Sequence, residues 1–177
     1  MTDTADISAL WQAAGRFPDK TYPVDSWRPE LCGDIDMVIR RDGVWLHEGR
    51  PIERPEMVRL FSKLLRHEDG DYFLVTPVEK LRLRVEDLPF RMVDRQGLVC
   101  VTDQGARLPL GAEHPLVFDV QGESWRPRVR VRGGLWARMT RAETYRLFEA
   151  AEIEMGEGCV RLTLEGQAVE AALCEVG

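Results

Sequence analysis

The sequence predicts an α+β fold made of two similar units, each with a helix packed on an antiparallel sheet. Two repeats lead to this prediction. The segment "VIRRDGVW" at 38–45 aligns with "VRVRGGLW" at 129–136, with the turn glycine and the tryptophan in register. After each segment comes a stretch of helical spacing that contains Arg-Leu-Phe, at 59–61 and again at 146–148. A repeat of this kind indicates internal duplication of one unit.

Residues 1–30 are predicted to form a short helix and a proline-containing linker. Asp3 or Thr4 can cap the helix, and Gly15 can end it. The apolar residues at helical spacing on one face are Ile7, Leu10, Trp11 and Ala14. Three prolines then favour an extended linker, at Pro18, Pro23 and Pro29.

The first α+β unit is predicted over residues 31–112. "IDMVIR" and "VWLHEG" read as the two strands of a hairpin, because Asp-Gly between them supplies the positive φ values of a tight turn. Pro55 suits the first turn of the following helix. The apolar stripe of that helix is Met57, Leu60, Phe61, Leu64 and Leu65. Short strands separated by Pro, Gly and Asp follow it.

The second unit is predicted over residues 113–177. In "RPRVRVR" the arginines and valines alternate, so a strand would place four guanidinium groups on one face and turn the valines toward the core. Thr140 and Glu143 have the spacing of a capping box for the second helix. Trp45 and Trp136 occupy corresponding places in the two hairpins, and both are expected to be buried.

Composition limits the classes of function. The chain has 177 residues and a net charge of −6, which argues against nucleic-acid binding driven by phosphate neutralisation. It has no apolar run of the length that spans a membrane and no signal-peptide pattern, so a cytoplasmic location is expected. The four cysteines are scattered, which predicts neither disulfides nor a zinc ribbon. Seven arginines in 125–146 precede seven glutamates in 149–177, so these segments could neutralise each other.

Several short motifs follow one another in an order typical of one bacterial family. They are "CGDIDM", "DGVW", "RLFSKLLRHEDGDYFLVTPVEK", "VEDLPF" and "AEHPL". The chain thereby resembles the bacterial domain-of-unknown-function family 1285 over about residues 27–159. The resemblance implies two related α+β units, the second loosely similar to a pleckstrin-homology-like fold. It also implies a nucleotide-type ligand site between the units, a signalling role and no established enzymatic activity.

The stretch "CGDID" contains the first candidate site residues. As a strand it would place Cys32, Asp34 and Asp36 on one face, with Ile35 and Met37 directed to the core. The two aspartates could hold a loop or pair with arginines, contact a ligand, or act as a base. Two neighbouring carboxylates are not the cationic setting that a nucleophilic cysteine needs, so Cys32 is expected to be a buried structural residue.

The remaining candidates for ligand contact are the charged residues of "TPVEK" and "VEDLPF" and two arginines of the alternating segment. These are Glu79, Lys80, Glu86, Arg128 and Arg130. Arg128 and Arg130 are expected to pair with carboxylates of the C-terminal segment; the alternatives are a solvent-exposed face and binding of an anion. The sequence contains no Walker loop, no dinucleotide fingerprint and no catalytic triad spacing, so no catalytic residue, metal ligand or cofactor is predicted.

The sequence therefore favours a non-catalytic ligand-binding or sensory protein that binds a nucleotide-type ligand in signal transduction. The alternative is a protein-interaction or dimerisation module without a small-molecule ligand, with a second copy or a signalling protein as partner. The question of enzymatic activity stays open, with a non-enzyme favoured.

Overall fold

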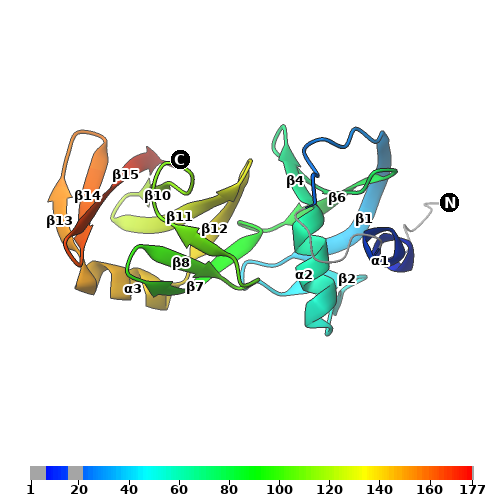
Figure 1. The fold of residues 1–177 in the computed structure, drawn as a ribbon, viewed down its shortest axis with the longest axis horizontal. Coiled ribbons are helices and arrows are strands. Elements are labelled where there is room, and N and C mark those ends of the chain that lie inside the picture. The colour runs from blue at the N-terminus through cyan, green and yellow to red at the C-terminus, as the bar shows by residue number, and fades with distance from the viewer. Residues whose placement is uncertain (1–6, 16–21, 177) are drawn as a thin grey trace. The chain divides into compact units, whose positions relative to one another are not determined.

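Strands dominate the fold, and the predicted α+β class is wrong. The computed structural model describes residues 7–15 and 22–176, and these contain fifteen strands and three helices (Figure 1). The strands form two large mixed sheets, and one of the sheets curves into a half-barrel, in place of the expected antiparallel sheets covered by helices. The sheets are mixed because strands that are far apart in the sequence pair in parallel, which a local sequence pattern does not specify. Of the helices described, none is long and apolar enough to cross a membrane.

The first compact unit ends at Asp87 and contains a six-stranded sheet in the order β3-β2-β1-β6-β5-β4. Strands β1 and β6 are parallel, and the other neighbours are antiparallel. The elements are α1 (Ile7–Gly15), β1 (Leu31–Ile39), β2 (Trp45–His47), β3 (Arg50–Pro51), α2 (Pro55–Leu64), β4 (Leu65–Glu68), β5 (Asp71–Val75) and β6 (Lys80–Val85).

Local sequence accounts for these elements. Gly43 has φ 88° in the turn between β1 and β2, a conformation that glycine adopts without steric cost. Pro55 is in the first turn of α2, as predicted, and Phe61 and Leu64 of its apolar stripe are buried. Leu65 continues the chain as a strand residue rather than a helical one. The expected capping residues Asp3 and Thr4 lie outside the described residues.

The second compact unit begins at Leu88 and contains a nine-stranded sheet in the order β13-β14-β15-β10-β11-β12-β7-β8-β9. Its elements are β7 (Phe90–Gln96), β8 (Val99–Thr102), β9 (Arg107–Pro109), β10 (Leu116–Gln121), β11 (Ser124–Arg132), β12 (Leu135–Met139), α3 (Arg141–Ala150), β13 (Glu152–Met155), β14 (Cys159–Leu164) and β15 (Gln167–Glu175). Buried apolar residues on one face of this sheet form the core, and α3 contributes Leu147 to it.

The boundary between the units differs from the sequence expectation. The expected second unit began at residue 113, whereas the compact unit begins at Leu88. The difference arises because β7 pairs in parallel with β12, with Phe90 opposite Ala137. This pairing attaches the antiparallel strands β7, β8 and β9 to the second sheet.

A six-stranded arrangement recurs in the two units. In the first, three strands, a helix and three strands follow in sequence, and the first and last strands pair in parallel as β1 and β6. Strands β10–β12, α3 and β13–β15 repeat this order, with β10 and β15 as the parallel pair. By strand order, the β1–β2 hairpin corresponds to β10–β11, whereas the sequence match paired it with β11–β12.

Both segments of the sequence match nevertheless form hairpins with equivalent pairing. Trp45 lies opposite Ile39, and Trp136 lies opposite Arg130, which are the aligned positions of the two segments. Trp45 is buried, but Trp136 is only half-buried because its side chain is on the face of the second sheet that lies opposite the core, where Arg128 stacks on it. The expected burial is therefore confirmed for the first tryptophan only.

Candidate functional site

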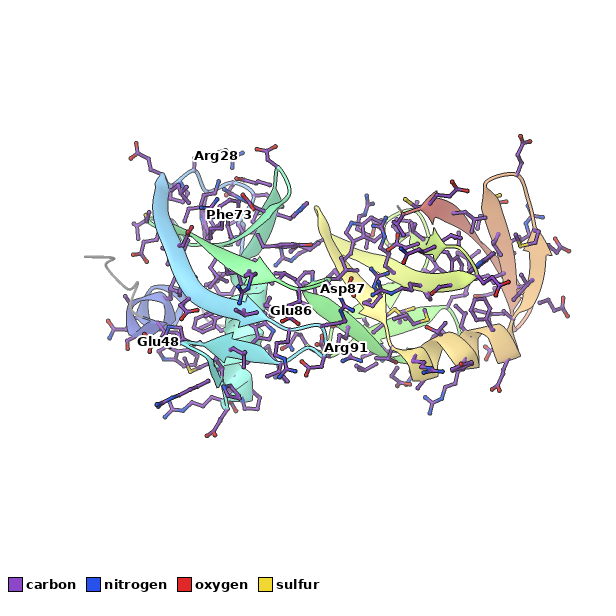
Figure 2. The ribbon with its side chains drawn as sticks, turned by 180° about the vertical axis from the view of Figure 1, so that it is seen from behind. Arg28, Glu48, Phe73, Glu86, Asp87 and Arg91 are labelled. Carbon is purple, nitrogen blue, oxygen red and sulfur yellow. The ribbon has the colours of Figure 1, made fainter. Side chains whose placement is uncertain are left out.

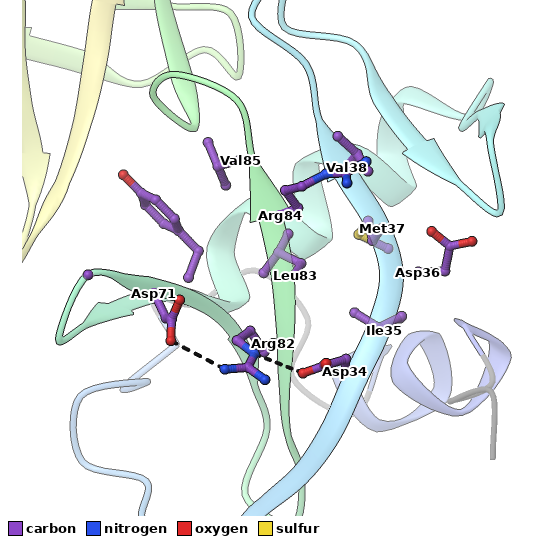
Figure 3. Close-up of a pocket in the computed structure, with 12 residues that line it drawn as sticks. Asp34, Ile35, Asp36, Met37, Val38, Asp71, Arg82, Leu83, Arg84 and Val85 are labelled. Carbon is purple, nitrogen blue, oxygen red and sulfur yellow. Dashed lines mark hydrogen bonds and ion pairs between the residues drawn. The ribbon is translucent and has the colours of Figure 1, made fainter. Parts of the chain in front are cut away.

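A pocket of about 510 Å³ lies within the first unit, where β1 and β6 meet the turn between β4 and β5 (Figure 3). It contains both predicted aspartates of "CGDID". Its lining residues come from three segments and are Asp34 to Val38, Gly70 to Tyr72, and Arg82 to Val85. The charged groups among them are three aspartates and two arginines.

An irregularity in the β1–β6 pairing accounts for the position of this pocket. Asp34 lies opposite Arg82 and Val38 lies opposite Arg84, so four residue steps on β1 match two on β6. Such a bulge locally disrupts the ladder and bends the longer strand. Figure 3 shows Asp36, within this bulge, on the other side of β1 from Arg82. The alternation of exposed and buried residues predicted for this strand is confirmed from Asp34 to Met37.

Two carboxylates hold Arg82 in place. Its Nε donates to Oδ1 of Asp34 at 2.8 Å, and its Nη1 lies 3.5 Å from Oδ2 of Asp71. These contacts raise the pKa of the Arg82 guanidinium, mainly through the hydrogen bond to Asp34. All three side chains are more than two-fifths exposed, so the ion pairs contribute little to stability. Their effect is to fix the direction of Arg82 at the pocket.

Arg84 differs from Arg82 in having no acidic partner. Among the residues that the structure describes, its guanidinium makes no ion pair, and the side chain is exposed. Figure 3 shows it extending toward Val38 of β1. The carboxylate of Asp36 likewise has no side-chain partner in the described part of the chain. The pocket thus presents the Arg84 guanidinium to a ligand, whereas the Asp36 carboxylate lies on the other side of β1 from Arg82.

Sequence reasoning missed Arg82, Arg84 and Asp71. A signal was present in "KLRLRV", because alternation along a strand places Lys80, Arg82 and Arg84 on one face and the leucines on the other. The burial of β6 confirms this alternation. Nothing in the sequence indicated that Asp34 would lie opposite Arg82, since that contact depends on a parallel pairing across more than forty intervening residues.

The other candidates of the first unit have structural partners outside the pocket. Lys80 forms an ion pair with Glu68, and its ammonium lies 4.2 Å from the centre of the Phe73 ring. Glu79 belongs to a turn in which its carbonyl accepts from the Thr76 backbone. The Glu86 carboxylate accepts from the Arg41 amide at 2.9 Å, and Figure 2 shows it well apart from Phe73.

Arg66 connects this ion pair to the preceding segment. It is 7% exposed and donates to the carbonyls of Val24 and Trp27, at 2.8 Å each. Its Nη2 also lies 2.7 Å from the Glu68 carboxylate. A hydrogen bond from Lys80 is the main cause that lowers the pKa of Glu68, and Arg66 adds to it. This network anchors the segment before β1, which contains a turn at 24–26.

Arg128 and Arg130 are in the second unit, and their expected pairing with C-terminal glutamates is wrong. Arg128 donates to Asp119 of β10 at 2.8 Å and stacks on Trp136 at 4.1 Å. Arg130 donates to the carbonyls of Ala112 and Glu113. Pairing to near neighbours replaces the expected contact because β10, rather than the C-terminal segment, is adjacent to β11.

The expectation of a buried Cys32 is also wrong. Its side chain is exposed, and its Sγ lies 3.4 Å from the Glu30 carbonyl. Cys32 is near the start of β1, before the part of the strand that is covered on one face. Within residues 7–15 and 22–176, no three His, Cys, Asp or Glu residues are arranged to hold a metal ion.

A second pocket, of about 550 Å³, was not anticipated. It lies among α1, the β2–β3 turn and the start of α2, and it is lined by residues that include His47, Glu48, Arg50, Glu53 and Met57. Charged and apolar residues are mixed in its lining, and this mixture does not favour one class of ligand. The pocket at the β1 bulge is therefore the better candidate site.

The two units and the mixed sheets place the chain in a class of two-unit, mostly β proteins. Family models identify it further: residues 22–88 match the N-terminal domain of the domain of unknown function DUF1285, and residues 89–170 match the C-terminal domain of that family. The chain therefore belongs to the DUF1285 family, as its motifs suggested.

Two crystal structures of the family are similar to this chain. A DUF1285 family protein from Silicibacter pomeroyi DSS-3 is 37% identical, with a TM-score of 0.77, and 94% of each chain is covered. A DUF1285 family protein from Shewanella baltica OS155 is 27% identical, with a TM-score of 0.53, over 64% of this chain and 91% of that one. No curated protein matches the chain.

Proposed function

We propose that this protein is a non-catalytic binding protein, and that its first unit takes a nucleotide-type small molecule into the pocket at the β1 bulge. The observation that carries the proposal is the state of the two pocket arginines. Arg82 is fixed by Asp34 and Asp71, whereas Arg84 has no acidic partner among the described residues. An unpaired guanidinium beside a cavity suits a phosphate group, because its planar fork binds phosphate at two points.

The mixed charge of the pocket favours a ligand that has both a phosphate and hydrogen-bond donors. Asp34 and Asp71 can accept hydrogen bonds from hydroxyl or amino groups, while Arg84 binds the anionic group. A nucleotide combines these features. The volume of about 510 Å³ is within the range of small-molecule sites. A role in signal transduction, which the family resemblance implies, and a cytoplasmic location, which the sequence composition favours, are part of the proposal.

A screen by thermal shift tests this function. Mononucleotides, cyclic nucleotides and dinucleotide second messengers are each added to the full chain, because a ligand that binds only the folded state raises its stability. One compound class should raise the Tm in a saturable way. The Arg84→Gln variant should lose most of that shift.

Arg59→Gln is the matched control, because Arg59 is an exposed arginine of α2 in the same unit but outside the pocket. It should keep the full shift. Equal shifts in both variants, or no shift with any nucleotide, would contradict binding at Arg84. The alternative function is that of a dimerisation module. It is favoured by the separation of basic and acidic residues on one face of the second unit's sheet.

A further inference from the structure

We propose that the polar face of the second unit's sheet binds the same face of a second copy of this chain, forming a two-fold symmetric dimer. The polar face is the side of the nine-stranded sheet that includes Asp119 and Arg128. It belongs to a different unit from the proposed ligand pocket, so this proposal does not rest on the proposal of ligand binding.

Strand register places charged residues from β13 to β7 on this one face. Arg128 lies directly opposite Val117 and Arg138, and Arg138 lies opposite Arg91. On the other side, Val117 lies opposite Ala172 of β15. Directly opposite residues in neighbouring strands project to the same face of a sheet.

Strand register also places charged residues of β13, β14 and β15 on the polar face. Cys159 lies opposite Ala172, Arg161 lies opposite Glu170, and Glu154 lies opposite Arg161. The alternate residues of these strands, such as Val160 and Leu162, are fully buried. They belong to the opposite face.

The opposite face is the core and is covered by α3. Phe118 stacks on Phe148 of this helix with ring centres 5.8 Å apart, and both Phe118 and Val129 are fully buried. The polar face is therefore not the one that α3 covers. Its residues are half-buried or exposed, apart from Asp119, which is 8% exposed.

Charge is segregated across the polar face. The end formed by β11, β12 and β7 has five arginines: Arg91, Arg126, Arg128, Arg130 and Arg138. Asp119 lies on the neighbouring strand β10 and pairs with Arg128 and Arg138. The end formed by β13, β14 and β15 has three glutamates and one arginine: Glu152, Glu154, Glu170 and Arg161. Glu152 and Glu154 are both exposed, and Arg161, which lies opposite Glu154, forms its ion pair with Glu170. One face thus has a basic end and an acidic end.

A two-fold axis parallel to the strands makes such a face complementary to itself. Rotation about an axis along β15 and β10 places the acidic end of each copy over the basic end of the other, and the same pair of contacts forms twice. The residues along the axis include Ala172 and Val117, whose small size lets the sheets approach. Long arginine and glutamate side chains then span the gap where twisted sheets diverge.

The size of the face suits this partner. Seven strands at a spacing of about 4.8 Å, and about six residues along each, give a projected area of roughly 600 Å². This is at the lower end of what each partner buries in a specific interface, about 600 to 1,000 Å². The overall charge of −6 makes a free polyanion a poor partner for the whole chain, whereas a second copy places its carboxylates only over the basic end of this face.

The first test is sedimentation of the full chain over a range of concentrations. A monomer–dimer equilibrium is expected, with a dissociation constant that rises at least tenfold between about 50 mM and about 500 mM salt, because the charged ends are screened. A chain that stays monomeric at low salt would overturn the proposal. So would growth into polymers without a dimer plateau, because a head-to-tail contact does not close.

Charge reversal then locates the contact. Glu152→Arg with Glu154→Arg, and separately Arg126→Glu with Arg130→Glu, should each weaken the dimer at least tenfold. Mixing these two variants should restore association as a heterodimer, since each then supplies the charge that the other needs. A restored heterodimer also shows that both variants are folded.

The matched controls are Glu149→Arg and Arg141→Glu, which change exposed residues of α3 on the opposite side of the sheet. They should leave dimerisation unchanged. If they weaken the dimer as much as the polar-face variants do, or if mixing the two polar-face variants restores nothing while circular dichroism shows both folded, the assignment of the contact is wrong.

Discussion

At the scale of single residues, Asp119 makes the most demanding polar contacts of the second unit. It is 8% exposed and accepts hydrogen bonds from Arg128 at 2.8 Å and from Arg138 at 2.9 Å. Asp119→Asn would leave two half-buried guanidinium groups without a counter-charge. We expect a loss of about 3 kcal/mol in the free energy of unfolding, measured by urea denaturation. A loss smaller than that of the exposed-pair variant Glu170→Gln would contradict this role of Asp119.

Glu68 makes stability depend on pH. The hydrogen bond from Lys80 lowers its pKa in the folded state, so its contribution is fully present above the usual glutamate pKa of about 4.3. That contribution is lost as the pH falls through the lower folded-state value. Glu68→Gln should therefore destabilise the protein at neutral pH and reduce the loss of stability on acidification. Parallel stability curves for the variant and the natural chain from neutral to acidic pH would refute this.

The cysteines should differ sharply in reactivity. Cys32 is exposed, whereas Cys100 is buried, and burial raises the pKa of the Cys100 thiol to about 12. Because the thiolate is the reactive form, a thiol reagent should modify Cys32 in the native protein and Cys100 only after unfolding. Mass spectrometry after brief labelling reads out both sites. Modification of Cys100 at the rate of Cys32 would show that the second unit opens readily.

At the scale of elements, Thr140 determines where α3 begins. Its hydroxyl accepts from the Glu143 amide at 3.3 Å, as the capping-box spacing predicted. The second bond of a capping box, from the Thr140 amide to the Glu143 side chain, does not form. The Thr140 amide donates to the Met92 carbonyl instead, and the Glu143 side chain pairs with Arg146. Thr140→Ala should cost about 1 kcal/mol, whereas Thr140→Ser should cost much less. Equal losses for both substitutions in thermal unfolding would mean that the hydroxyl is not the cause.

Local patterns predicted many of these elements. Asp-Gly before Val44, Pro55 in the first turn of α2 and the arginine–valine alternation of β11 each produce the expected structure, because turn chemistry and side-chain alternation act over a few residues. The sheet order could not be predicted in this way. Strands β1 and β6 are joined by a helix and four short strands, and no short-range signal specifies that they pair in parallel.

In the candidate site, too, local features could be predicted from the sequence and contacts between distant strands could not. Alternation predicted an outward-facing Asp34, but its partner Arg82 follows only from the parallel pairing. The unpaired Arg84 depends on the bulge in β1, which changes the register between the two strands. The residues that sequence patterns emphasised in "TPVEK" proved to support the fold instead, with Lys80 paired to Glu68.

At the scale of the whole molecule, the two units share a strand order but present different surfaces. The first has a pocket where the parallel pair is bulged, and the second has a charge-segregated sheet face. If both proposals hold, one unit binds a small molecule and the other binds a second copy. A monomeric variant should therefore still bind the ligand, and this separates the two proposals.

The most direct test of the ligand site is hydrogen–deuterium exchange of the full chain, with and without the nucleotide that gives the largest thermal shift. Binding at the pocket should slow amide exchange in residues 34–38 and 82–85 of the natural chain. The Arg84→Gln variant should lose this protection at the same ligand concentration, and Arg59→Gln should retain it. Protection confined to the second unit, or protection at the pocket that survives Arg84→Gln, would contradict ligand binding at the β1 bulge.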